Sequence, residues 1–324
     1  MPPILWIILG LVGLIFGAEL VVRYGARLAS GLGVPPILVG LTVVSLGTSL
    51  PELAVGIDAV RTGAGSLAVG NITGTNIVNL LLILGLSAAI RPIPLGLQTL
   101  RLDLPAMGAA AFLLLVFSVD GALQVWEGVP LVVFAIVYIV LLVRSTRREN
   151  AVVLAEFAEE YPVSRPRERR AGPILLQSGL LVVGLVVIVF GAQWLVEGAV
   201  DLATALGVSD ALIGLTIVAI GTSAPELATT ILSTFRGDRD IAVGNLIGSS
   251  IFNLTMILGV TLLFAPGTVA IDPELVHVDL PAMVAVSLVC GPLMISGRRL
   301  SRAEGIGLVA AYVLYFGYLI VART

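Results

Sequence analysis

The chain has 324 residues, of which 58% are hydrophobic and only 12% are charged, with a formal net charge of −3. Water-soluble domains are closer to half apolar and one quarter charged, so this composition excludes an ordinary soluble protein and gives no indication of a nucleic-acid partner. The only cysteine, Cys290, excludes an intrachain disulfide. The composition indicates a protein that crosses a lipid bilayer several times.

Apolar runs of about 20 residues, the length that crosses a bilayer as a helix, recur along the whole chain. The first run has no positively charged segment before it and is too long for a signal peptide, so we expect a retained span. The sequence therefore predicts an all-α polytopic membrane protein with ten transmembrane helices. The predicted spans are 4–24, 36–60, 66–90, 103–120, 128–146, 173–198, 210–234, 241–265, 278–296 and 303–322.

The orientation follows from the basic residues, all 18 of which are arginine. If the N-terminus lies outside and ten helices alternate, only Arg61 and Arg323 are outside, and the other 16 of the 18 lie inside. Such a bias follows the positive-inside rule. We therefore expect a cell-membrane protein with both termini outside and the long 147–172 connection in the cytoplasm.

The chain also contains an internal duplication. A shift of 174 residues aligns 40–57 with 214–231 at 12 of 18 positions, and 68–85 with 242–259 at 11 of 18. Each half holds five predicted helices, and an odd number makes the second copy enter the membrane from the opposite side. We predict two inverted-topology five-helix repeats, joined by a linker. Their bounds are 1–146, 147–172 for the linker, and 173–324.

The most polar part of each half lies inside an apolar span. "LGTSLPELAVG" at 46–56 and "IGTSAPELATT" at 220–230 place Glu52 and Glu226 several residues from a span end. A charge at the bilayer centre costs about 2.5–3.5 kcal/mol on insertion scales. Because the two glutamates share one register in the duplication, we expect them to have a functional role.

The proline before each glutamate adds to this polarity. Pro51 and Pro225 have no N–H, so each leaves a carbonyl one turn earlier without its helical partner. Hydrocarbon offers no donor for such a carbonyl, and a bound cation is a suitable partner. Hydroxyls share the same helix face, one turn before each glutamate: Thr48, Ser49, Thr222 and Ser223.

The following span in each half carries a second polar motif. "GNITGTNIVN" at 70–79 and "GNLIGSSIFN" at 244–253 each place three polar residues at i, i+4 and i+8. These are Asn71, Thr75 and Asn79, and Asn245, Ser249 and Asn253. All candidate ligands carry oxygen, which suits hard cations such as Ca²⁺, whereas transition metals prefer His or Cys. Two carboxylates balance one divalent or two monovalent ions.

These four motifs, in this order, resemble the sodium/calcium exchanger branch of the calcium/cation antiporter superfamily, in its prokaryotic form. The resemblance implies a secondary active antiporter, not an enzyme, that exchanges sodium for calcium by alternating access at a midplane site. It implies no cofactor, since Ca²⁺ and Na⁺ are the transported ligands. The implied ion ligands are Glu52, Glu226, Thr48, Thr222, Ser49, Ser223, Asn79, Asn253, Thr75 and Ser249, with backbone carbonyls near Ser45 and Ala219.

Other interpretations remain open. A proton-coupled calcium or cation exchanger on the same scaffold is the main alternative, while a passive channel or an intramembrane enzyme has less support. Many family members carry aspartate where this chain has Asn253, which leaves the preferred cation and the stoichiometry open. Asp103 and Asp279 precede Leu-Pro, and we expect them to cap helices. Glu19 and Asp58 are further candidates for an ion access path.

Overall fold

The structure is a computed structural model that describes residues 2–32, 34–160, 171–206 and 219–323. Eight helices are long and apolar enough to cross a membrane, and a ninth crossing results if the bent pair Pro36–Thr48 and Leu50–Arg61 is one span. The prediction of an all-α polytopic membrane protein is therefore confirmed. The predicted 210–234 span lies partly outside the described residues, so the count of ten stays a prediction.

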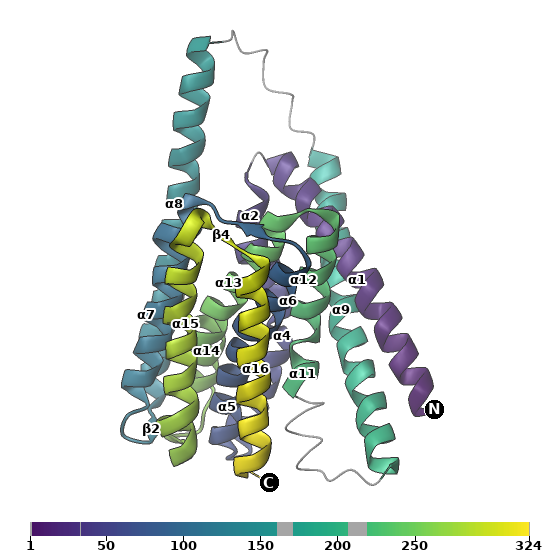
Figure 1. Ribbon diagram of the computed structural model, residues 1–324, viewed down its shortest axis with the longest axis vertical. Helices are drawn as coiled ribbons and strands as arrows, with labels where there is room; N and C mark the ends of the chain where they lie inside the picture. Colours follow the sequence, from purple (N-terminus) through teal and green to yellow (C-terminus); the bar gives the residue numbers. More distant parts are fainter. Residues whose placement is uncertain (1, 33, 161–170, 207–218, 324) are drawn as a thin grey trace.

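The spans of the first half are helices, and several of them contain a short π-helical segment. They run roughly along the long axis of the molecule (Figure 1). The elements are α1 (Pro3–Leu32), α2 (Pro36–Val39), η1 (Gly40–Val44), α3 (Ser45–Thr48), α4 (Leu50–Arg61), α5 (Gly65–Ile77), η2 (Val78–Ile83), α6 (Leu84–Ile90), β1 (Ile93–Pro94), η3 (Thr99–Asp103), α7 (Leu104–Phe117), β2 (Ala122–Leu123), η4 (Val125–Glu127) and α8 (Gly128–Glu160). The fifth span thus continues as helix into the predicted linker.

The second half repeats this order wherever the structure describes it. Its elements are α9 (Ala171–Ala205), α11 (Ala219–Thr222), α12 (Ala224–Arg236), α13 (Arg239–Phe252), η6 (Asn253–Ile257), α14 (Leu258–Leu263), β3 (Val269–Ala270), η7 (Leu275–Asp279), α15 (Leu280–Ile295), η8 (Ser296–Arg298), β4 (Arg299–Leu300) and α16 (Arg302–Arg323). The π-helical segments recur at matching places in the two halves, which supports a structural duplication.

Both polar motifs interrupt a helix at equivalent points. The backbone leaves helical geometry at Ser49 (φ −85°, ψ 6°) and at Ser223 (φ −85°, ψ 4°), each two residues before a proline. In the first half the helix axis bends by 41° at this break. The prediction that these prolines open the helix is confirmed, because proline cannot donate the hydrogen bond that a continuous helix needs.

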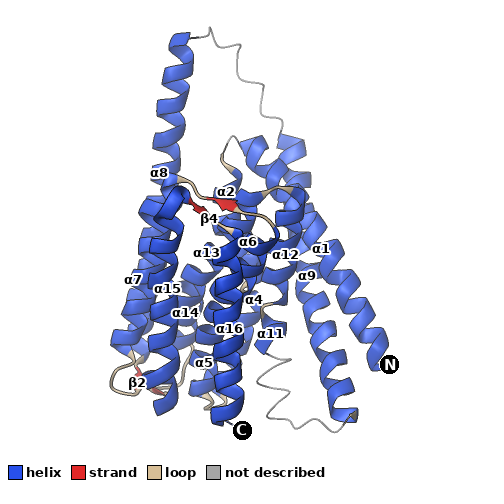
Figure 2. Ribbon diagram, in the orientation of Figure 1, coloured by secondary structure: helices blue, strands red, loops and turns tan. Residues whose placement is uncertain are grey.

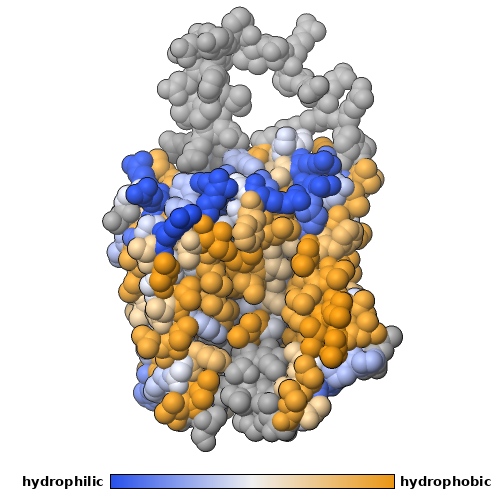
Figure 3. All heavy atoms as spheres, turned by 45° about the vertical axis from the view of Figure 1, so that its right-hand side comes forward, coloured by the Kyte–Doolittle hydropathy of each residue, from blue (hydrophilic) through white to orange (hydrophobic). Residues whose placement is uncertain are grey.

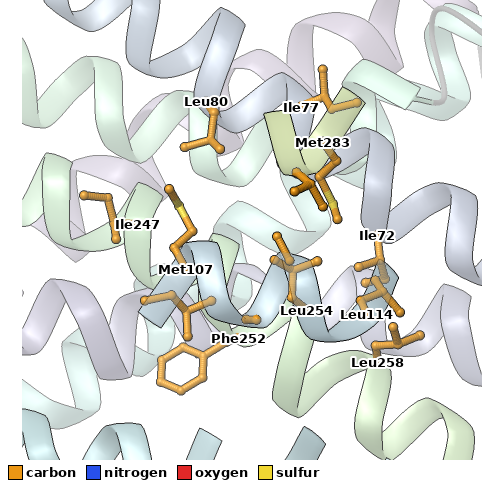
Figure 4. Close-up of a cluster of buried hydrophobic side chains, with 14 of the residues drawn as sticks. Ile72, Ile77, Leu80, Met107, Leu114, Ile247, Phe252, Leu254, Leu258 and Met283 are labelled. Carbon is orange, nitrogen blue, oxygen red and sulfur yellow. The ribbon is translucent and has the colours of Figure 1, made fainter. Parts of the chain in front are cut away.

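The hydrophobic core lies between α5, α7, α8, α13, α14 and α15. Figure 4 shows side chains of this core, among them Ile72, Met107, Phe252 and Leu258, converging on one another. Figure 3 shows apolar residues over the sides of the molecule, with hydrophilic residues gathered in a band toward one end. Exposed leucine, isoleucine and valine on the outer helices fit a surface that faces lipid rather than water.

Short antiparallel strand pairs join the two halves at both ends of the core (Figure 2). Ile93 pairs with Leu300 in β1–β4, and Leu123 pairs with Val269 in β2–β3. Arginines gather at the β1–β4 end, where Arg302 donates to the Ile90 carbonyl at 3.3 Å. We call this the arginine-rich end. The two termini lie toward the opposite end (Figure 1).

The predicted capping role of Asp103 is wrong, while that of Asp279 stays a prediction. Asp103 has helical backbone angles and its side chain makes no capping hydrogen bond, because a π-helical segment already leads into α7. Each buried carboxylate instead accepts a hydrogen bond from a tyrosine hydroxyl. Tyr138 donates to Asp103 at 3.0 Å, and Tyr315 donates to Asp279 at 2.7 Å. The two pairs hold η3 to α8 and η7 to α16.

An apolar cavity of about 740 Å³ separates α1 and α9 from α12. Its wall includes Leu14 of α1, Leu195 of α9, and Leu227 and Ile231 of α12. The lining described by the structure contains no charged or amide side chain. Beside the cavity α1 still contacts α12, and α1 and α9 pack closely against each other along their length (Figure 1).

Glycines make the close packing of α1 and α9 possible. A Cβ atom placed on Gly191 would lie 2.7 Å from the Leu14 nitrogen and 2.9 Å from the Gly13 carbonyl carbon. Such distances are too short for any side chain, so the two backbones touch directly. Small residues at helix crossings are typical of membrane proteins, where close backbone approach replaces the hydrophobic effect.

We expect Gly191→Ala to lower the free energy of unfolding by about 1–3 kcal/mol, because the added methyl group forces the helices apart. Thermal unfolding in detergent measures this change. Gly179→Ala in the same helix is the matched control, because no atom lies within 4 Å of its Cβ position. Equal stability of the two variants would show that the crossing is not tightly packed.

Candidate functional site

The two predicted carboxylates lie at equivalent places, each at the start of a half-helix. Glu52 is in the first turn of α4 and Glu226 in the first turn of α12, just after the breaks at Ser49 and Ser223. Both side chains are fully buried. The N-terminal end of a helix carries a partial positive charge, which favours an anionic group there. The broken helices thus position both carboxylates and partly stabilise their charge.

These carboxylates lack a cationic partner in the part of the chain that the structure describes. The ion pairs found there both involve Glu19, and neither involves Glu52 or Glu226. Neither oxygen of Glu52 has a hydrogen-bond partner, nor does Oε2 of Glu226. The two groups are near enough to repel each other electrostatically. A pair of buried negative charges therefore requires protons or bound cations for balance.

The polar motifs also contain neutral side chains whose buried polar atoms have no hydrogen-bond partner in the described structure. Asn79 and Asn253 are fully buried, and neither the oxygen nor the nitrogen of either amide has a partner. The hydroxyls of Thr75 and Ser223 are likewise buried without one. Such groups are rare in native proteins, because each loses its hydration without compensation. Their concentration in one small set of motifs marks a ligand site.

The asparagines are displayed by π-helical segments. Asn79 lies in η2 and Asn253 begins η6, at the same register of the two halves. π-Helical turns widen a helix locally and are frequently found at functional sites. Sequence periodicity predicted a regular helix here, so the widened turn is a feature that the structure adds.

Hydrogen bonds connect the polar motifs of the two halves. Thr48 donates to Asn245 Oδ1 at 3.2 Å and lies 3.4 Å from the Ser249 hydroxyl. Ser49 donates to Glu226 Oε1 at 3.5 Å. Hydroxyls of the first half thus contact the carboxylate and the second polar motif of the other half. The structure therefore brings the two predicted half-sites together.

Some predicted ligands are already hydrogen bonded or are less buried than the two glutamates. The Ser45 carbonyl accepts from Thr48 at 3.3 Å and from Ser249 at 3.4 Å, so it is already hydrogen bonded. Ala219 begins α11 and Thr222 ends it, and the Thr222 side chain is only partly buried. Asn245 was not among the predicted ligands, although it contacts Thr48. Its match to Asn71 in the duplication was the signal that pointed to it.

The arrangement is chemically specific. Among the described residues there is no group of three or more His, Cys, Asp or Glu side chains that suits a metal ion. The site instead combines two carboxylates with hydroxyl, amide and carbonyl oxygens. Weakly charged, oxygen-only coordination suits alkali and alkaline-earth cations, which accept flexible geometry and exchange readily. The residues present therefore fit reversible binding of such cations.

A family model described as "Sodium/calcium exchanger protein" matches residues 2–144 and 176–321. A putative antiporter, CaxA of Alkalimonas amylolytica, is 35% identical over 96% of both chains. Sodium/calcium exchanger MaX1 of Methanosarcina acetivorans is 33% identical, over 95% of this chain and 96% of its own. The matches extend over almost the whole sequence and include both polar motifs.

Solved structures give the same result. A structure of the sodium-calcium exchanger NCX_Mj, soaked with 10 mM Na⁺ and zero Ca²⁺, superimposes with a TM-score of 0.83 at 28% identity and covers 99% of both chains. Another, soaked with 2.5 mM Na⁺ and 0.1 mM Ca²⁺, gives a TM-score of 0.82 and covers 99% of this chain and 98% of that one. The overall arrangement of the helices is thus shared.

We expect Glu52→Gln to stabilise the cation-free protein, because it removes one of two buried charges that repel each other. We also expect that variant to lose its stabilisation by Ca²⁺. For the unmodified chain, Ca²⁺ at 100 times its dissociation constant adds about 2.7 kcal/mol to the free energy of unfolding. Thermal unfolding in detergent with chelator or with Ca²⁺ measures both effects.

The surface variant Glu197→Gln is the control for this experiment, since Glu197 is exposed and bonded only to Gln193. It should respond to Ca²⁺ as the unmodified chain does. A Glu52→Gln protein that Ca²⁺ stabilises to the same extent would show that Glu52 is not a ligand.

Proposed function

Because this chain belongs to the sodium/calcium exchanger family of cation antiporters, we propose that it exchanges sodium for calcium across a membrane by alternating access. One observation carries the proposal. Two fully buried glutamates have no cationic partner among the described residues, and they lie in motifs rich in neutral oxygens without hydrogen-bond partners. Such a site is stable only when cations or protons occupy it.

The proposed ligand set is that of the two pairs of polar motifs, and the contacts of Thr48 and Ser49 with the other half support it. Glu52 and Glu226 supply the charge shared by both ions, and Thr48 and Thr222 supply oxygens to Ca²⁺. In this proposal Asn79 and Asn253 occupy the middle of the site. The sites for Na⁺ use the remaining hydroxyls and the first-turn carbonyls, namely Ser49, Ser223, Thr75 and Ser249 with the carbonyls near Ser45 and Ala219.

Charge balance explains why the two ions exclude each other. Two carboxylates are neutralised by one Ca²⁺ or by two Na⁺, and either load leaves little net charge to move through the low-dielectric interior. An empty or half-filled site keeps unpaired buried charge, so it crosses between the two access states slowly. Exchange rather than uniport follows, and no cofactor or covalent step is needed.

The proposed architecture is ten helices in two inverted five-helix repeats, 1–146 and 173–324, with 147–172 as a cytoplasmic linker. The matching helix breaks at Ser49 and Ser223 support the duplication. The clustering of arginines at one end supports a cytoplasmic assignment for that end, with both termini outside the cell membrane. In this arrangement each repeat contributes half of the site from its own side.

The test is calcium uptake into proteoliposomes loaded with sodium. We expect uptake to depend on the outward sodium gradient, and Glu52→Gln and Glu226→Gln each to reduce it to background while the protein elutes as a folded monodisperse species. Either substitution leaves one buried charge too few to bind Ca²⁺. The conservative control is Glu197→Gln, which should retain full uptake.

Calcium uptake that ignores the sodium gradient in both directions would contradict sodium coupling. In that case uptake driven by a pH gradient in sodium-free buffer identifies the proton-coupled alternative, and dissipative flux without uphill movement identifies a channel. Normal transport by either glutamine variant would show that the two-carboxylate site is wrong.

A further inference from the structure

Helix α12 has two faces of opposite character. Leu227, Ile231 and Phe235 line the apolar cavity toward α1 and α9. The other face begins with Glu226 and continues with hydroxyl residues at i+3, i+4, i+7 and i+8, which recur on one side of a helix. These residues, which we call the hydroxyl face of α12, are Thr229, Thr230, Ser233 and Thr234, and each is at most 2% exposed.

The equivalent face of α4 has no hydroxyl. The two helices share the Pro-Glu-Leu motif and the same break, but beyond Glu52 the chain has apolar residues or glycine at the matching positions. With the shift of 174 residues these are Val55, Gly56, Ala59 and Val60. Gly56, Ala59 and Val60 are buried, as their counterparts are. Helix packing at this position therefore does not require hydroxyl groups, since α4 packs without them.

The difference changes the hydrogen bonding of the neighbouring helix. Asn245 of α13 donates from Nδ2 to the Thr230 hydroxyl at 3.3 Å. Its counterpart in the first half, Asn71 of α5, has no hydrogen-bond partner for Nδ2. The residue of α4 that matches Thr230 is Gly56, which has no side chain to accept the bond. The polar network around the site is thus extended on one side only.

Part of the hydroxyl face is free to bind a ligand. The Thr229 hydroxyl is fully buried and has no hydrogen-bond partner. Ser233 donates to the Thr229 carbonyl at 2.7 Å, and Thr234 donates to the Thr230 carbonyl at 2.8 Å. A hydroxyl that donates to its own helix still has lone pairs to offer to a cation. Successive oxygens one turn apart therefore extend away from Glu226.

The hydroxyl face ends at the arginine-rich end, where the arginine that ends α12 forms an ion pair. Arg236, the last residue of α12, is paired with Glu19 of α1, which also binds Arg23 at 3.0 Å. Two acidic residues, Asp238 and Asp240, come shortly after Arg236 in the sequence. Carboxylates therefore lie among the arginines at this end of α12 and can attract an approaching cation.

Other hydroxyls do not account for the asymmetry. Ser87 of α6 and Thr261 of α14 are matched by the same shift of 174 residues, and the hydroxyl of each is buried without a hydrogen-bond partner. Ser87 adds one hydroxyl oxygen to the first half, and Thr261 adds one to the second. Four further hydroxyls on α12 against none on α4 remain as the difference between the two halves.

We propose that the hydroxyl face of α12 is the transit route by which partly hydrated cations pass between the Glu226 carboxylate and the arginine-rich end, and that α4 provides no equivalent route toward the other end. This inference rests on the proposed exchange function and deepens it. The two access routes of the exchanger are chemically different. One replaces lost hydration with the hydroxyl oxygens of α12, while the matching face of α4 offers no hydroxyl.

Thiol accessibility tests the route directly, because Cys290→Ser alone removes every native cysteine. In this background Ser233→Cys and Thr229→Cys probe α12, and their register mates Ala59→Cys and Val55→Cys probe α4. Sealed vesicles receive a cationic, membrane-impermeant methanethiosulfonate reagent from either side. We expect the α12 cysteines to react only from the arginine-rich side and about tenfold faster than the α4 cysteines from any side, since apolar walls exclude a charged reagent.

Equal reaction rates for the register mates, or no reaction of the α12 cysteines in vesicles that exchange ions normally, would overturn the proposed route. The same vesicles are assayed for sodium-dependent calcium uptake, which separates the two proposals. Absent uptake by the unmodified chain refutes the exchange function. Normal uptake without asymmetric labelling refutes the route alone.

A second pair of variants avoids the bulk of the reagent. Ser233→Ala with Thr234→Val removes two hydroxyls at similar volume, and Ala59→Ser with Val60→Thr adds two to α4 as the matched control. We expect the first pair to slow calcium capture at low calcium from the arginine-rich side by about tenfold, with equilibrium Ca²⁺ affinity in detergent unchanged. The control pair should not slow capture from that side. Unchanged capture by the first pair, or a parallel loss of affinity, would contradict a transit role.

Discussion

The burial of two carboxylates in the membrane-spanning core is the constraint on which the rest of this structure depends. Glu52 and Glu226 are fully buried, and no arginine pairs with either of them in the described part of the chain. Each is held at the start of a half-helix, where the partial charge of the helix end favours an anion. Amides and hydroxyls without partners share the same motifs. The site therefore lacks the charge balance and the hydrogen-bond partners that bound cations or protons would supply.

The surrounding fold keeps this unfavourable arrangement in place. The large hydrophobic core of α5, α7, α8, α13, α14 and α15 fixes the π-helical turns that present Asn79 and Asn253. Strand pairs tie the two halves at both ends of that core, and each Asp–Tyr pair holds a helix beside its neighbour. By contrast, α1 and α9 pack mainly against each other through glycines, with a cavity between them and α12. The molecule thus combines a large central core with a smaller buried cluster in which α1 and α9 contact α2, η1 and α12.

Much of this organisation is readable from the sequence, because each signal has a direct physical cause. Apolar run length gave the spans, and the repeated Pro-Glu motif gave both helix breaks and both carboxylates. The π-helical turns have no such signature, because local periodicity does not distinguish 3.6 from wider turns over five residues. The role of Asp103 was misjudged for another reason: its tyrosine partner is 35 residues away. The hydroxyl face of α12 was present in the printed sequence, but its meaning depends on burial.

The apolar cavity beside α12 has a consequence for how tightly the membrane stays sealed. The cavity lies along the apolar face of α12, and Glu226 and the hydroxyls lie on its opposite face. Only the width of this helix therefore separates the proposed ion route from an apolar space. An ion entering the cavity would lose its water and gain no ligand, so the cavity insulates as the bilayer does. α12 therefore offers oxygen ligands for a cation on one face only. A single polar substitution on its apolar side, at Leu227 or Ile231, is where an electrical leak around the coupling site would begin.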